Sequence, residues 1–369
     1  MRRIGALCAL FCLLLLPAAA AAEEEAARIA GDLDVSGWQA YADGAGLEVD
    51  VKQMLLSLVQ AQDGWDVQNA LARLGDALRA QLRESAGLIA LFAAPALLCA
   101  LARQFAPQNG GVLEWMSALV AAGALLAAFA QAFAQAGRAI SLLSQCGEAI
   151  SPLLIALLSA AGGGATAVML TPMAALAGSL IGTVAGGGGL ALCGCAAGVA
   201  AAGELSGHVR FSKLFKLLRS VCNGLMGALM TAFLGLMGVQ GILGAGYDGA
   251  AVRTAQYAVD NLMPVVGGDV ADTMGALIGS ARLVKNAAGV TGLCLLLLVC
   301  VQPVLAILAP LLASRVAAAM VEPLADGPAA RLIDRLGDVL SMLLVVVVSS
   351  CVIGLMLIGA VLACGGAAG

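Results

Sequence analysis

The sequence predicts an all-α polytopic membrane protein. Charged residues make up 11% of its 369 residues and hydrophobic ones 61%, whereas a soluble domain carries about 25% charged residues. Several apolar stretches reach the length of about 18 residues that a helix needs to cross the hydrocarbon core of a bilayer. The chain also begins with the pattern of an export signal. We therefore expect about six to seven transmembrane helices, with broken or re-entrant segments and amphipathic helices at the surface.

Residues 1–22 have the pattern of a signal peptide. Two arginines precede an apolar centre from Leu7 to Leu16, and a run of alanines then offers a cleavage site. Whether the signal is cleaved or kept as an anchor, it places residues 23–85 on the outer face of the membrane. That segment includes an amphipathic helix, which either rests on its own membrane domain or docks a partner. The apolar stripe of this helix is Val67, Leu71, Leu74, Leu78 and Leu82.

Residues 86–369 form the predicted multi-pass membrane domain. Its apolar segments lie near 86–102, 116–137, 149–203, 221–246, 287–313 and 339–363. The block 149–203 is long enough for two spans, but prolines and glycine runs interrupt it. Interrupted helices at membrane depth are tolerated where protein or a water-filled cavity covers the freed backbone, and transporters place substrate sites at such breaks. The alternative is a flexible, glycine-rich helix pair that serves packing alone.

Gly178, Gly182 and Gly186 form two overlapping G-x-x-x-G patterns inside this block. In lipid, this spacing lets two helix backbones approach closely, so that dispersion contacts hold the helices together without a hydrophobic drive. We expect these three glycines to serve helix packing.

The basic loop 204–220 predicts the orientation of the membrane domain. Its four cations recur three residues apart: Arg210, Lys213, Lys216 and Arg219. The positive-inside rule places such a loop in the cytoplasm. Four spans before the loop would instead leave it outside, together with residues 23–85. The conflict disappears if 149–203 crosses an odd number of times, for instance once with a re-entrant hairpin, and the total is then about six full spans.

Residues 247–286 form the second long polar region. Two apolar stripes in it, separated by a stop at Pro264, predict two amphipathic helices that lie on or dip into the membrane surface. The shorter loop 314–338 is mixed in charge.

The sequence lacks the residue patterns of several enzyme classes. His208 is the only histidine, which excludes H-E-x-x-H zinc sites, and its place in a basic loop argues against a histidine-based triad. There is no P-loop and no G-x-S-x-G elbow. The predicted spans contain almost no carboxylates for a proton relay. Most of the eleven cysteines sit in or beside apolar spans, where cysteine behaves as a small hydrophobe. We expect no catalytic site, no metal, no cofactor and no nucleic-acid partner.

One region, residues 238–292, resembles a known family. Its pattern comprises Gly238-Val239-Gln240-Gly241, Asp248-Gly249, Arg253-Thr254-Ala255, Asn261, Met263-Pro264-Val265-Val266-Gly267, Asp272-Thr273 and Leu283-Val284-Lys285-Asn286 with Gly289 and Gly292. This pattern resembles the stage III sporulation protein AE family of endospore-forming bacteria. The resemblance extends more loosely over most of the chain, and the alanine- and glycine-rich stretch 162–203 departs from it.

The resemblance implies a permease-like membrane subunit of the channel or secretion complex between mother cell and forespore. It implies a place in the mother-cell-derived outer forespore membrane, beside other membrane subunits and a secretion-type ATPase that would supply energy. It brings no catalytic residues. The candidate functional residues are the polar and turn-forming positions Asp248, Arg253, Asn261, Pro264, Asp272, Lys285 and Asn286. These positions either form a site or merely shape a surface hairpin.

Two other classes of function remain open. A stand-alone secondary transporter of a small solute is favoured by the broken helices, and the lack of buried ionisable residues argues against it. A non-conducting membrane scaffold, which assembles other subunits and passes nothing, is the third hypothesis.

Overall fold

The computed structural model describes residues 26–47, 49–59, 79, 87–95, 97–98, 110–205, 211–262, 267–321 and 328–363. Its elements are α2 (Ser36–Gly44), α3 (Val51–Val59), α5 (Gly110–Ala160), α6 (Gly164–Leu180), the π-helical η2 (Ile181–Gly189), α7 (Leu190–Leu205), α8 (Ser212–Leu262), α9 (Gly267–Val321) and α10 (Pro328–Ala363). Within these ranges the regular secondary structure is all helical, as predicted, and short turns connect the helices. The predicted signal peptide lies outside the described residues, as does almost all of the amphipathic helix at 67–82.

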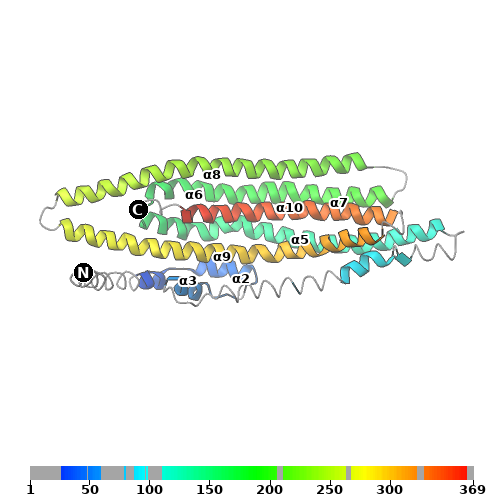
Figure 1. Ribbon diagram of the computed structural model, residues 1–369, viewed down its shortest axis with the longest axis horizontal. Helices are drawn as coiled ribbons and strands as arrows, with labels where there is room; N and C mark the ends of the chain where they lie inside the picture. Colours follow the sequence, from blue (N-terminus) through cyan, green and yellow to red (C-terminus); the bar gives the residue numbers. More distant parts are fainter. Residues whose placement is uncertain are drawn as a thin grey trace, which may run out of the picture.

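The long helices run alternately in opposite directions and form one elongated bundle (Figure 1). In this bundle α6, η2 and α7 follow one another as a single helical run from Gly164 to Leu205. The last helix, α10, lies in the middle and contacts α5, α7, α8 and α9. The short helices α2 and α3 pack on the outside of the bundle, against α5 and α9 respectively.

Five segments of the described chain are long and apolar enough to cross a membrane. They are Ala118–Ala160, Gly164–Glu204, Ser212–Gly238, Ile278–Val321 and Ala329–Ala363. By helix length and composition this is therefore a multi-pass membrane protein, as the sequence predicted. The predicted first span, 86–102, is described only in part and is not among the five. The count of six to seven spans stays a prediction.

The block 149–203 differs from the interrupted pair that we expected. Helix α5 continues through Pro152 to Ala160, and a turn follows in which Gly162 has a φ of 91°, a conformation that favours glycine. After this turn, α6 continues through Pro172, and the glycine run 186–189 lies in the π-helix η2, so the chain stays helical at both predicted breaks. After the turn the chain therefore forms one helical run, and the re-entrant segment stays a prediction.

The glycines of the G-x-x-x-G patterns face α5. A Cβ atom on Gly178 would lie 2.5 Å from the carbonyl oxygen of Ser144, and one on Gly186 would lie 3.3 Å from Ile140. On the other side of the contact, a Cβ on Gly147 would lie 2.6 Å from the carbonyl oxygen of Ala174. The two backbones thus approach more closely than any residue larger than glycine allows. This contact aligns the two helices side by side.

The N-terminal helix α2 inserts its aromatic side chains into the bundle. Trp38 is 1% exposed and lies against Gly292 of α9, where a Cβ would be 3.6 Å from the indole ring. Burial raises the pKa of Tyr41, whose hydroxyl lies near Cys146. These contacts place α2 beside the half of the bundle that is nearer to the turn between α5 and α6.

We expect Gly178→Ala to lower the thermal midpoint of the purified protein in detergent, because the new methyl group meets a backbone carbonyl that cannot move aside. Overpacking of this kind costs about 1–3 kcal/mol. The matched control is Gly198→Ala on α7, where a Cβ meets nothing within 4 Å. Equal midpoints for the two variants would show that the α5–α6 contact is looser than described.

Candidate functional site

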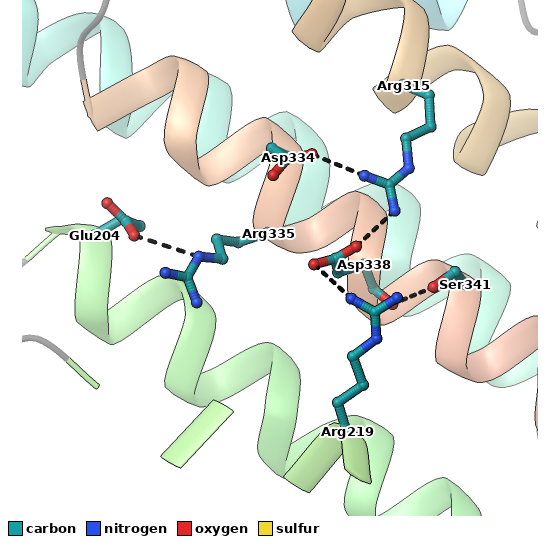
Figure 2. A network of polar contacts seen from close by, with 7 residues as sticks. All are labelled: Glu204, Arg219, Arg315, Asp334, Arg335, Asp338 and Ser341. Atoms are coloured by element: carbon teal, nitrogen blue, oxygen red, sulfur yellow. Dashed lines mark hydrogen bonds and ion pairs between the residues drawn. The ribbon is translucent and has the colours of Figure 1, made fainter. Parts of the chain in front are cut away.

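Charged side chains gather where the first turns of α10 meet three other helices (Figure 2). We call this group the charged cluster; it comprises Glu204 of α7, Arg219 of α8, Arg315 of α9, and Arg331, Asp334, Arg335 and Asp338 of α10. The residues come from four separate stretches of sequence. The antiparallel order of the helices brings them to one end of the bundle.

Asp338 joins three helices. One carboxylate oxygen accepts a bond from Arg315 at 2.6 Å, and the other pairs with Arg219 at 3.0 Å. The second guanidinium nitrogen of Arg315 bonds Asp334 at 2.7 Å, one helical turn earlier on α10. The side chain of Asp338 is 18% exposed. One half-buried carboxylate therefore holds arginines from α8 and α9 at the same point of α10 (Figure 2).

Glu204 makes the corresponding connection between α7 and α10. Its two oxygens lie 3.1 Å from Arg331 and 3.9 Å from Arg335. The guanidinium group of Arg335 also lies 5.3 Å from the centre of the Phe215 ring, a distance at which a cation and an aromatic face attract each other. This contact adds the beginning of α8 to the connection.

The backbones of α9 and α10 approach closely beside the cluster. A Cβ on Gly337 would lie 2.9 Å from the hydroxyl oxygen of Ser314. Ser314 directly precedes Arg315, and Gly337 directly precedes Asp338. The missing side chain at 337 thus lets the arginine reach two carboxylates with good geometry.

A second polar group lies at the opposite end of α10 and is made of two cations from α9, which we call the basic cap. Lys285 is 1% exposed, and its ammonium group donates to the carbonyl oxygens of Val361 and Leu362 at 3.4 and 3.3 Å. Arg282 donates to the carbonyl oxygen of Ala161, just after α5, at 3.4 Å. The last carbonyls of a helix have no partner within the helix and carry partial negative charge. The basic cap therefore satisfies the ends of two helices at once.

The predicted site residues fall into two groups. Asp248, Arg253 and Asn261 lie on the last turns of α8, and Asp272 lies near the start of α9. Their side chains, and Pro264, lie outside the described part. Of the remaining two, Lys285 forms the basic cap and Asn286 is exposed. The predicted helix pair is present in the backbone, as continuations of α8 and α9, and its place on the membrane surface stays a prediction.

Most of the charged cluster is not predicted by the sequence pattern. Arg219 belongs there only to a basic loop, and Arg315, Asp334 and Asp338 have no predicted role. The i, i+4 spacing of the two aspartates was the available signal, because it places both on one face of a helix. Arg138 and Glu148 lie within the candidate span Ala118–Ala160, although they fall between the predicted apolar segments 116–137 and 149–203.

The chemistry of these groups is structural. In the cluster each carboxylate is paired with at least one arginine, and no histidine or cysteine takes part. Within the described ranges, no set of three or more histidine, cysteine or acidic side chains is arranged to hold a metal ion. The cluster and the cap can fix helices relative to one another, and they offer no nucleophile beside a base.

We expect Asp338→Asn to destabilise the bundle by about 1–2 kcal/mol, because a neutral amide loses charge-assisted bonds to two arginines. The measurement is the thermal midpoint in detergent. Asp334→Asn is the matched control: its side chain is 58% exposed and pairs with one arginine, so its loss costs about 0.2–1 kcal/mol. A larger effect for Asp334 would contradict the central role of Asp338.

Comparison with known proteins agrees with the resemblance seen in the sequence. The family described as "Stage III sporulation protein AE" matches residues 49–365. The Stage III sporulation protein AE of Bacillus subtilis (strain 168) is 29% identical over 199 residues, which cover 54% of this chain and 50% of that protein. The alignment thus spans about half the length of this relative. No solved structure matches the chain. Because the family match covers most of its length, the chain belongs to the stage III sporulation protein AE family.

Proposed function

We propose that this chain is a membrane subunit of a sporulation-specific channel or secretion complex between mother cell and forespore. The observation that carries the proposal is the family match over residues 49–365, which includes all five candidate spans. The proposed location is the mother-cell-derived outer forespore membrane. The proposed partners are other membrane subunits of the complex, including a secretion-type ATPase.

The internal chemistry of the chain supports a subunit without its own energy source. The sequence has no P-loop, and the charged cluster and basic cap fix helices rather than catalyse a reaction. A chain of this kind depends on a partner if the complex moves material against a gradient. These properties fit a permease-like subunit of a larger membrane complex.

The bundle also supports a definite orientation. Two helical runs, α5 and α6–α7, precede the basic loop 204–220. If the segment 86–102 crosses as well, three spans separate this loop from the exported N-terminal segment, and the loop is then cytoplasmic, as the positive-inside rule requires. The contacts of α2 with the other half of the bundle agree with this orientation, because they place the N-terminal segment away from the basic loop.

Reporter fusions test the orientation. We expect a fusion after Phe211 to place its reporter in the cytoplasm. We expect a fusion after Leu262 to place its reporter on the outer side of the membrane, because α8 lies between the two fusion points. The informative control is a deletion of 86–102, which should reverse both signals. A cytoplasmic signal from both fusions would contradict the proposed crossings.

Gene deletion in the host tests the function. We expect loss of late forespore gene expression and of heat-resistant spores, both restored by the wild-type gene. Normal sporulation in the deletion strain would remove the hypothesis. Complementation with Asp338→Asn and Asp334→Asn, at matched protein levels, then shows whether the charged cluster matters in the cell.

A stand-alone secondary transporter is the second candidate. The observation that favours it is the pair of ionisable residues in a candidate span, Arg138 and Glu148, since such residues mark substrate or ion pathways in membranes. Solute uptake by the purified protein in liposomes without partners would favour the transporter over the complex subunit. A non-conducting scaffold would sustain assembly and show no transport in either setting.

A further inference from the structure

Most of the predicted basic loop is helical in the structure. Three of its four cations, Lys213, Lys216 and Arg219, lie on the first turns of α8, which begins at Ser212 and runs along one edge of the bundle (Figure 1). Positions three apart on a helix are neighbours on its surface, so the three side chains form a row of positive charge. This row lies at the beginning of the candidate span Ser212–Gly238.

The three cations differ in whether the protein neutralises them. Arg219 pairs with Asp338 at 3.0 Å (Figure 2). Lys213 and Lys216 are exposed, and neither forms an ion pair within the described part of the chain. At 1.5 Å per residue, Arg219 lies about 9 Å farther along the helix than Lys213. The protein thus pairs the cation that lies deepest in the span and leaves the two shallower ones to an external anion.

The length of the span places the two lysines at the level of lipid headgroups. Ser212–Gly238 has 27 residues, so as a helix it is about 40 Å long. A bilayer is about 40–45 Å thick when its headgroup regions are included. A span of this length therefore begins in one headgroup region and ends in the other, and its first two turns lie beside phosphate groups.

An exposed aliphatic strip runs beside the lysines. Leu214, Leu217 and Val221 follow one another at steps of three and four residues, and they are 42%, 59% and 46% exposed. Leu217 also lies four residues after Lys213, so the strip and the row of charge adjoin. Lipid tails are as apolar as leucine, and lysine stems lie along apolar surface with the ammonium group in a polar layer. We call Lys213, Leu214, Lys216, Leu217 and Val221 the α8 surface.

We propose that the α8 surface binds an anionic phospholipid. The phosphate lies between Lys213 and Lys216, and an acyl chain follows Leu214, Leu217 and Val221. Two ammonium groups give a phosphate charge-assisted hydrogen bonds. The aliphatic strip argues for a lipid rather than a free phosphate ion, because an ion would leave the strip without an apolar partner.

The charge around the α8 surface argues for an anionic lipid over a zwitterionic one. The neighbouring charged cluster holds four arginines against three carboxylates. It therefore adds to the positive charge of the two lysines instead of cancelling it. Clusters of basic side chains at a membrane surface attract anionic lipids. This inference goes beyond the proposed function, because it needs only a chain that crosses a membrane.

Lipid binding to the purified full chain in a neutral detergent tests the proposal. The probe is dioleoyl-phosphatidylglycerol, and native mass spectrometry measures the lipids retained per chain over a titration. A basic residue near a membrane surface changes the attraction to anionic lipid by about fivefold. We therefore expect the double variant Lys213→Gln, Lys216→Gln to weaken the apparent affinity by more than about tenfold. The matched control is Lys52→Gln, which removes an exposed lysine from α3 and leaves the affinity unchanged.

A second variant tests the path of the acyl chain. We expect Leu217→Ser to weaken binding of the same lipid several-fold, because it puts a hydroxyl in the middle of the aliphatic strip. Wild-type affinity in this variant would overturn the acyl-chain part of the proposal. The thermal midpoint of each variant without lipid shows whether it is folded, and we expect no change, because these side chains are exposed.

Two further probes identify the ligand. Dioleoyl-phosphatidylcholine has the same acyl chains without net charge, and binding equal to that of the phosphatidylglycerol would overturn the anionic headgroup. Inorganic phosphate, compared with chloride at equal ionic strength, is expected not to displace the lipid; displacement would show an anion site instead.

The double variant decides the proposal as a whole. Wild-type affinity in Lys213→Gln, Lys216→Gln would show that these lysines hold no lipid, and a protein partner would then be the remaining occupant of the α8 surface. Normal sporulation after gene deletion would defeat the proposed function and leave these binding measurements interpretable.

Discussion

The pairing of α9 with α10 is the interaction on which the rest of the bundle depends. Helix α10 lies in the middle, and α9 holds it near both ends: Arg315 binds Asp334 and Asp338 near its beginning, and Lys285 binds the last carbonyls. In lipid the hydrophobic effect does not drive apolar helices together, so packing and polar bonds must supply the attraction. Because α10 also contacts α5, α7 and α8, fixing it against α9 positions the other helices.

The glycine contacts show the second way in which this bundle is held together. At Gly178 and Gly147 the backbones of α5 and α6 approach until a single methyl group would not fit. Such close approach gains dispersion energy between the two helices. The glycines therefore fix the α5–α6 pair in a second way that needs no polar bond.

The sequence was sufficient to predict the helical class, the membrane environment and the family, because composition and long apolar runs reflect the solvent directly. It was not sufficient for helix boundaries. Pro152 predicts an interruption, yet α5 continues through it, and beside it Ser151 donates a hydrogen bond to the carbonyl oxygen of Gly147. The glycine run 186–189 likewise predicts an interruption, yet it lies in a π-helix. Local propensity predicts a break at such residues, and tertiary packing overrides it.

The charged groups were the hardest to predict, because their positions also depend on how the helices pack. Glu204, Arg219, Arg315 and Asp338 become neighbours only when four helices are placed, and no single segment shows this. Arg138 and Glu148 lie on a helix that a hydropathy reading divides into two, so each looked like part of a loop. In the structure α5 is one continuous helix, so both charges fall within a candidate span. Charged side chains at that depth must face protein or water, because contact with lipid tails is unfavourable. Helix continuity, more than residue type, therefore determines which charges of this protein fall within a candidate span.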